Sequence, residues 1–112
     1  MPSKRPTAIV VVLMTCPNRR TAGELAEQLV AGRLAACVNI IPAVQSIFRW
    51  KGKVDRCREL LLIVKTTSRR VKRLRHAVIA LHPYEVPELI VLTVTGGHRP
   101  YLRWVASCLS PS

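Results

Sequence analysis

The chain has 112 residues, a length typical of one domain, and its 18 Lys and Arg residues against six Asp and Glu give a net charge of +12. No apolar run approaches the roughly 18 residues that a membrane-spanning helix needs. We therefore expect a single domain over residues 1–112, with residues 1–6 flexible, no membrane contact and a cytoplasmic location.

The four cysteines, at positions 16, 37, 57 and 108, show no CxxC spacing and no pattern typical of zinc ligation. A chain of this length buries roughly two thirds of its unfolded surface and so needs no disulfides to build a core. We expect reduced thiols.

The first third of the chain predicts a strand followed by a helix. Residues 7–15 (TAIVVVLMT) are rich in β-branched side chains without alternation, which favours a strand buried on both faces. Residues 21–24 (TAGE) have the form of a capping box, apolar residues follow at helical spacing, and Gly32 ends the helix.

The middle of the chain predicts a hairpin. Residues 35–48 are extended, with a bulge or edge position at Pro42. Residues 50–53 (WKGK) form the turn, and residues 59–66 (ELLLIVKT) form a second strand that is apolar on both faces.

The last third predicts a second helix, a fourth strand and a closing helix. Thr67 or Ser68 caps the helix, and Pro83 stops it. Residues 88–95 form the strand, and residues 101–109 a short helix or segment. The apolar stripe of the second helix consists of Val71, Leu74, Val78 and Leu81.

This order is typical of the α+β class: a ferredoxin-like βαββαβ sandwich, with an antiparallel four-stranded main sheet, two helices on one face and a short C-terminal helix. Three strands are apolar on both sides, although two helices cover only one face of the sheet. A bare apolar face of this size is unfavourable in water. We therefore expect further copies of the chain to bury it in an obligate, symmetric oligomer.

Five uncommon strings occur in order along the chain: residues 34–40 (LAACVNI), 46–53 (SIFRWKGK), 59–67 (ELLLIVKTT), 82–89 (HPYEVPEL) and 101–104 (YLRW). With them the sequence, from about residue 8 to 109, resembles the CutA family of divalent-cation-tolerance proteins. The resemblance implies a compact homotrimer related in architecture to PII-type signalling proteins, a link to copper and other divalent cations, and no catalytic reaction.

Three positions depart from the family pattern. Some members have a cysteine at the end of the first strand, where this chain has Met14, and a second histidine where it has Leu81. The position after Trp50 is often acidic in relatives and is Lys51 here. The first two changes weaken a metal site, although the thioether of Met14 is a soft ligand suited to Cu(I).

The candidate metal ligands gather around His82. Its imidazole could bind copper or another divalent cation with a carboxylate from Glu85 or Glu88 and with sulfur from Cys16 or Met14. In the alternative, His82 lies at a helix C-terminus with its charged form favoured by the helix dipole, and both glutamates pair with surplus cations. The second interpretation needs no metal.

A second candidate site is a cleft between subunits. Packing at such a cleft is the simpler role for the aromatic residues, and in PII-like trimers this position also holds small ligands. Lys65, at the end of an apolar strand, would then meet an anionic group, or else it is solvated or paired with a glutamate. The cleft residues are Trp50, Lys65, Tyr84 and Trp104.

The surplus cations suggest nucleic acid as a partner, but the sequence has no base-reading motif and no aromatic stacking platform, so a solvated basic face is the simpler interpretation. Cys16 with His82 as a base would be a nucleophile pair, yet nothing positions a third group. There is also no Gly-rich phosphate loop, GxSxG or HExxH. We therefore expect no enzymatic activity and no organic cofactor.

Overall fold

The computed structural model describes residues 8–109 of the chain, so the flexibility expected for residues 1–6 lies outside the described residues. Four strands, three α-helices and one 3-10 helix make up this part of the chain. In order they are β1 (Ile9–Cys16), α1 (Arg19–Ala31), β2 (Cys37–Trp50), β3 (Lys53–Thr67), η1 (Ser68–Arg70), α2 (Val71–Leu81), β4 (Ile90–Thr93) and α3 (Arg99–Leu109).

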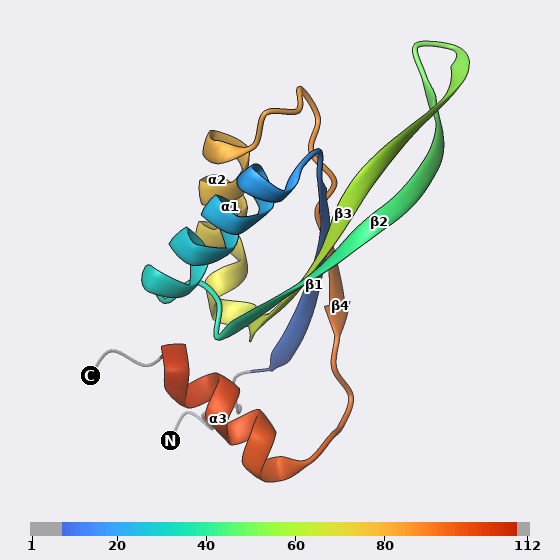
Figure 1. Ribbon diagram of the computed structural model, residues 1–112. Coiled ribbons are helices and arrows are strands. Elements are labelled where there is room, and N and C mark those ends of the chain that lie inside the picture. The colour runs from blue at the N-terminus through green and yellow to red at the C-terminus, as the bar shows by residue number, and fades with distance from the viewer. Residues whose placement is uncertain (1–7, 110–112) are drawn as a thin grey trace.

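The four strands form one antiparallel sheet in the order β2-β3-β1-β4. Val12 in the middle of β1 lies opposite Val64 of β3 on one side and opposite Val91 of β4 on the other. Helices α1 and α2 pack on one side of this sheet, and α3 lies at its lower end (Figure 1). The ferredoxin-like arrangement predicted from the sequence is confirmed.

The helix-covered side of the sheet holds the core. Val12, Met14, Leu62 and Val64 have no exposed surface, and they form one cluster with apolar side chains of α1 and α2. The helix residues of that cluster are Ala22, Leu25, Leu29, Leu74 and Val78.

The opposite side of the sheet, called the open face below, is apolar but only partly covered. Residues directly opposite each other on paired strands share a face, and the register therefore places Leu13, Ile63 and Ile90 together. Ile90 is 48 % exposed, whereas Leu13 and Ile63 are half-buried. The further apolar members are Val11, Ile41, Leu61 and Leu92. Within one chain, the strands expected to be buried on both faces are buried on one.

The start of α1 differs from the prediction. Asn18, three residues before the expected capping box, is the N-cap, and its Oδ1 accepts a hydrogen bond of 2.8 Å from the backbone N–H of Thr21. An Asn side chain is as good an N-cap as Ser or Thr, and it comes first in the chain, so the predicted capping box at residues 21–24 was wrong. The predicted end was correct, because Gly32 is the C-cap.

Helix α2 also begins differently from the prediction. The chain first makes the 3-10 turn η1, and Thr67 before it makes no side-chain capping bond, which contradicts the predicted cap. The helix ends at Leu81, with His82 as C-cap directly before Pro83, as predicted. Leu81 is 43 % exposed and so does not belong to the buried stripe, because the helix ends before this turn can pack on the sheet.

The β2–β3 hairpin extends as a two-stranded ribbon beyond the helices (Figure 1). A bulge interrupts its register between Ile41 and Val44, at the predicted Pro42, and Ala43 has a φ of 62° there. Lys51 and Gly52 both have positive φ in the turn, the conformation that the twist of a two-residue hairpin favours.

The last elements differ from the prediction in length. Strand β4 has four residues rather than the eight expected over 88–95, and it is a short edge strand. Helix α3 begins at Arg99, two residues before its expected start. No helix within residues 8–109 is both long and apolar enough to cross a bilayer.

Candidate functional site

His82 is held in place by both of its ring nitrogens. The side chain is 7 % exposed at the end of α2, where Pro83 turns the chain away from the helix. Its Nε2 lies 2.6 Å from the carbonyl oxygen of Thr15, and its Nδ1 lies 3.1 Å from the backbone nitrogen of Tyr84.

Those two contacts fix the tautomer of the ring. A backbone N–H can only donate and a carbonyl can only accept, so Nδ1 of His82 accepts from Tyr84 and Nε2 donates to Thr15. The ring is therefore neutral in this arrangement, whereas the dipole alternative favoured its charged form. Neither nitrogen has a lone pair directed at open space.

Cys16 lies beside His82, as the metal hypothesis expected. Its Sγ is 3.9 Å from Nε2 of His82, and the side chain is fully buried at the end of β1. Burial, and next the negative charge of Glu59, raise the pKa of the Cys16 thiol to about 11. The thiol therefore stays protonated at neutral pH, and a protonated thiol is a poor metal ligand and a poor nucleophile.

Met14 lies two residues earlier on the same strand. It is fully buried, pairs across the sheet with Leu62 and belongs to the hydrophobic cluster under the helices. Its packing explains why a flexible thioether is suitable here, since Met fills irregular gaps in a core.

Glu59 is the carboxylate of this region, and the sequence interpretation missed it. It is 5 % exposed at the start of the buried half of β3, and its Oε2 accepts a hydrogen bond of 2.7 Å from the hydroxyl of Tyr84. Burial by itself would raise the pKa of Glu59, but hydrogen bonds from Ser46, Tyr84, Thr15 and Cys57 lower it overall. The carboxylate is therefore ionised at neutral pH.

The same bond acts on Tyr84. Burial, followed by the hydrogen bond to Glu59, raises the pKa of the phenol, so Tyr84 remains a donor. Its ring lies 4.7 Å from that of His82, centroid to centroid. These residues form one group, which we call the polar cluster: Thr15, Cys16, Ser46, Cys57, Glu59, His82 and Tyr84.

The two predicted carboxylates lie elsewhere. Glu85 and Glu88 are in the loop after α2, and the structure gives neither a hydrogen bond to His82. A weak signal for Glu59 was present in the sequence, because this residue directly precedes a continuous apolar run, LLLIV; Glu88 precedes a similar run, LIVL, and is exposed. Where the strand is buried, a carboxylate at its start is buried with it and needs hydrogen-bond donors there.

The polar cluster does not fit a resident metal ion in this arrangement. No group of three or more His, Cys, Asp and Glu side chains within residues 8–109 is arranged to hold one. Of the donors beside one another, Cys16 is a protonated thiol and His82 uses both nitrogens in hydrogen bonds. Within one chain the cluster is a closed hydrogen-bond network.

One chain does not bring the four predicted cleft residues together. Trp50 is at the tip of the hairpin, 41 % exposed, with Nζ of Lys51 5.9 Å from its ring. Trp104 is on α3, where its ring packs on Tyr101 at 5.5 Å. Lys65 lies on the open face and donates to Asn39, while Tyr84 is in the polar cluster. A cleft between subunits stays a prediction.

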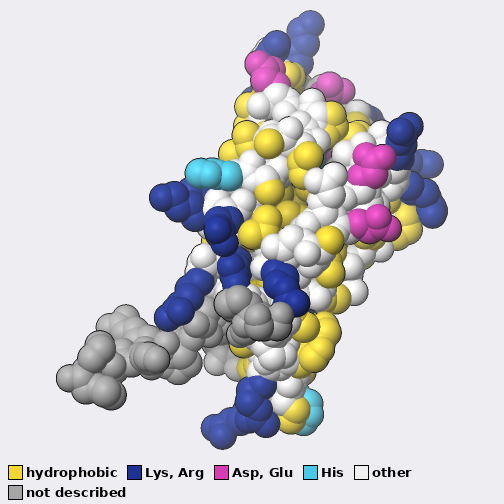
Figure 2. All heavy atoms as spheres, turned by 90° about the vertical axis from the view of Figure 1, so that its left-hand side faces the viewer, with side chains coloured by type: hydrophobic (Ala, Val, Ile, Leu, Met, Phe, Trp, Pro, Cys, Tyr) yellow, Lys and Arg dark blue, Asp and Glu magenta, His cyan; other side chains and the backbone are white. Residues whose placement is uncertain are grey.

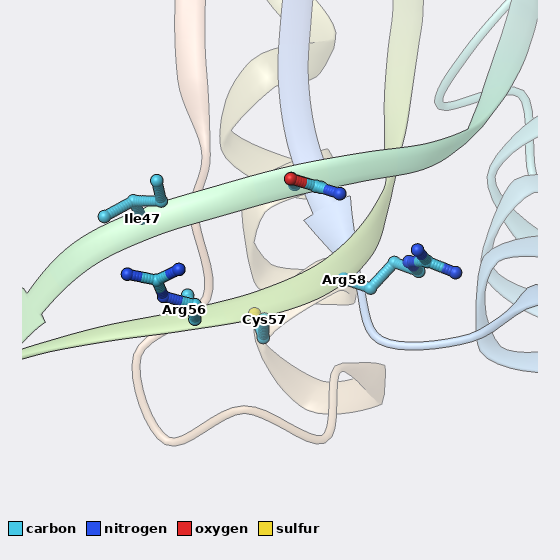
Figure 3. Close-up of a pocket in the computed structure, with 5 residues that line it drawn as sticks. Ile47, Arg56, Cys57 and Arg58 are labelled. Carbon is cyan, nitrogen blue, oxygen red and sulfur yellow. The ribbon is translucent and has the colours of Figure 1, made fainter.

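Two shallow hollows lie on the sheet. One, of ≈ 310 Å³, is on the hairpin ribbon and is lined by Ile47 of β2, which lies opposite Arg56 of β3, and by Cys57 and Arg58 farther along β3 (Figure 3). The other, of ≈ 390 Å³, is lined by Arg19, Ile40, Pro42 and Leu60. Cys57 is shared between the first hollow and the polar cluster.

Comparison with known proteins gives consistent results. The family model of the CutA1 divalent ion tolerance protein matches residues 10–108. The divalent-cation tolerance protein CutA of Thermus thermophilus is 50 % identical over 85 % of this chain and 92 % of its own length. Protein CutA of Homo sapiens is 47 % identical over 89 % of this chain, which spans 56 % of that longer relative.

Solved structures show the same fold. The divalent cation tolerance protein of Thermus thermophilus has a TM-score of 0.89 at 47 % identity, with 91 % of this chain and 99 % of that chain covered. The PII-like protein CutA of Nostoc, in apo form, has a TM-score of 0.83 at 33 % identity, with 90 % and 97 % covered.

The names of relatives differ in compartment. A structure from Archaeoglobus fulgidus, 32 % identical over 91 % of this chain and 99 % of its own with a TM-score of 0.88, is described as periplasmic. The Arabidopsis thaliana relative, 44 % identical over 92 % of this chain and 57 % of its own length, is described as chloroplastic.

The match over residues 10–108, together with these identities and the shared fold, shows that the chain belongs to the CutA1 divalent ion tolerance family.

Proposed function

We propose that the chain is a non-catalytic divalent-cation tolerance protein that works as a homotrimer and takes a divalent cation, or a small ligand, at the clefts between its subunits. The observation that carries this proposal is the open face. It is a largely apolar surface of half-buried or exposed residues from all four strands, and α1 and α2 lie on the other side. Further copies of the chain are the simplest cover for it.

The polar cluster supports a role at a subunit boundary. Its carboxylate, Glu59, lies in β3 where the buried half of that strand begins, next to the part of the β2–β3 ribbon that extends beyond the helices and is free to contact a second chain. The donors available within one chain are engaged, and a cation site would need ligands from a neighbouring subunit or a rearranged His82. In the small-ligand alternative, the same clefts would be lined by Trp50, Lys65, Tyr84 and Trp104.

Copper is the proposed cation because sulfur and imidazole are the donor types that copper accepts and that magnesium or calcium does not. To supply them, Cys16 would have to lose its proton, His82 would have to give up a hydrogen bond, and Met14 would have to leave its packed position. The proposed absence of catalysis is supported by Cys16, whose raised pKa of about 11 leaves it a weak nucleophile.

A cytoplasmic location is part of the proposal. The four cysteines are free in the structure, which fits a reducing compartment. Relatives carry differing compartment names, so the location is argued from the thiols of this chain alone.

Calorimetric titration with Cu(II), Cu(I) and Zn(II) tests the cation site. We expect the wild-type protein to bind copper and the His82→Ala variant to bind it at least about tenfold more weakly, a difference of about 1.4 kcal/mol. His98→Ala, at an exposed histidine, is the matched control and should titrate like the wild type. Met14→Leu keeps the core volume, so it tests the thioether without threatening the fold. Identical titrations of wild type and His82→Ala would remove the site.

A further inference from the structure

Two stretches of the chain contain no acidic residues. Residues 60–84 contain six Lys and Arg and no Asp or Glu, and residues 89–112 also lack acidic residues. The helices η1, α2 and α3 come from these two stretches. The charge of +12 is therefore unevenly distributed over the fold.

The folded chain leaves the cations of α2 without acidic partners. Within residues 8–109 one ion pair occurs, between Arg20 and Glu24 on α1 at 3.1 Å. The structure shows none for the exposed cations of η1 and α2 in the same range. Figure 2 views the helical side and shows Lys and Arg side chains at its left and centre with no Asp or Glu among them, whereas at the right and top Asp and Glu lie beside other Lys and Arg side chains.

Four of these cations make one surface, which we call the α2 basic face: Arg69, Lys72, Arg73 and Arg75. All four are exposed, whereas Leu74 and Val78 of the same helix are fully buried under them. Arg70 does not belong to the surface, because it is half-buried and donates to the carbonyl oxygen of Leu109. Lys72 and Arg75 are three residues apart and therefore neighbours on the surface of α2, Arg73 follows Lys72, and Arg69 lies in η1 directly before the helix.

The position of these charges is unfavourable for the helix itself. Lys72 and Arg73 lie in the first turn of α2, which contains no acidic residue. The N-terminal end of a helix carries a partial positive charge, so cations there repel both the dipole and one another. A bound anion would relieve both repulsions. This second observation distinguishes the surface from an ordinary solvated face, in which charges of both signs alternate.

We infer that the α2 basic face binds the phosphate backbone of double-stranded DNA. A duplex carries one negative charge per about 1.7 Å of its axis, and a row of exposed Arg and Lys contacts it by displacing counterions. This binding reads no sequence, since contacts to phosphate oxygens carry no sequence information. It goes beyond the proposed cation binding and does not depend on it.

Two other anionic partners fit the surface less well. An anionic membrane requires a continuous apolar helix face that can enter the lipid interface. Leu74 and Val78 are buried in the core, and the exposed Ile79 and Leu81 are two residues apart, so they do not form one face. Single-stranded nucleic acid requires aromatic side chains on which its bases stack, and α2 has no Phe, Tyr or Trp.

The test compares two variants that lose the same charge. Lys72→Gln/Arg73→Gln/Arg75→Gln removes three of the four cations of the α2 basic face, and Lys53→Gln/Arg56→Gln/Arg58→Gln removes three cations from the hairpin. Fluorescence anisotropy with a labelled duplex of roughly 20 base pairs, about two helical turns, gives the affinity over roughly 50 to 200 mM salt. Circular dichroism of each variant checks that the fold is kept.

We expect the wild type to bind with an affinity that falls steeply with salt. The α2 variant should bind at least about tenfold more weakly, and its salt slope should be smaller by about 2 to 3, since each neutralised phosphate contributes about 0.9 to the slope. The hairpin variant should stay within about threefold of the wild type. Equally weakened binding by both variants, no wild-type binding at the lowest salt, or tighter binding to phosphatidylserine vesicles than to the duplex would each overturn the inference.

Discussion

The two faces of the sheet are built from similar residues, yet only one of them is buried within a chain. On the covered face, Val12 and Leu62 have no exposed surface under α1 and α2. On the open face, Leu92 is 45 % exposed and Leu13 is half-buried. The apolar residue types therefore do not predict which face a single chain buries. They indicate that both faces are buried in the assembly, and the position of the helices determines which face is left for other copies.

The largest effect is expected from a charge placed on the open face. Leu13→Asp would put a carboxylate in the middle of the proposed interface, where an unpaired buried charge costs several kcal/mol. The variant should sediment as a monomer or fail to fold. Ile79→Asp, at a 58 % exposed apolar residue of α2, is the control and should sediment like the wild type. A Leu13→Asp protein that keeps the wild-type mass would contradict the role of this face.

A large effect is also expected on the covered face. Leu62→Ala should lower the free energy of unfolding by about 2 to 5 kcal/mol, because it leaves a cavity in a fully buried cluster. Urea denaturation measures this. The open-face variant Leu92→Ala sharpens the comparison: its effect should exceed that of truncating an isolated, 45 % exposed side chain and should depend on protein concentration. A small effect that does not change with concentration would mean that Leu92 faces water.

Glu59 should make stability depend on acid. Its folded pKa is below the ordinary value of 4.5, so ionised Glu59 stabilises the fold above that pH, and the stabilisation is lost as pH falls through the folded pKa. Glu59→Gln should lower stability at pH 7 by about 1 to 3 kcal/mol, because it replaces a charged acceptor of several bonds. Its unfolding free energy should then change less than that of the wild type below pH 4.5. Parallel pH curves for the two proteins would argue against an ionised carboxylate.

The smallest effect concerns the first turn of α2. Arg73→Gln removes a cation from the positive end of the helix dipole and should raise the free energy of unfolding by about 0.3 to 1 kcal/mol at low salt. The difference should shrink as salt is added. Arg103→Gln on α3 is the matched control, since this arginine lies in the middle of its helix. A destabilised Arg73→Gln protein would show that this cation has a partner.

The sequence was sufficient for the architecture because its signals are local. The strand composition of β1 and β3, the bulge at Pro42 and the end of α2 before Pro83 each depend on a few neighbouring residues. The prediction for the start of α1 failed for the same reason: two good local caps compete, and Asn18 comes first. The predicted burial of Leu81 was wrong because burial there depends on how far α2 packs along the sheet, which the local spacing of apolar residues does not show.

The site was predictable only in part. His82 and Cys16 were expected together and lie 3.9 Å apart. Glu59 was missed because its environment comes from strand register, which brings Ser46, Thr15 and Tyr84 to it from three separate segments. The hydrogen bonds that engage both nitrogens of His82 could not be read from residue types, since one of them ends on the backbone carbonyl of Thr15.

Sedimentation equilibrium of the wild-type protein at low micromolar concentration tests the central claim most directly. If further copies bury the open face, the particle has three times the 12.5 kDa mass of one chain and shows no folded monomer on dilution. A well-folded particle of 12.5 kDa would contradict the account.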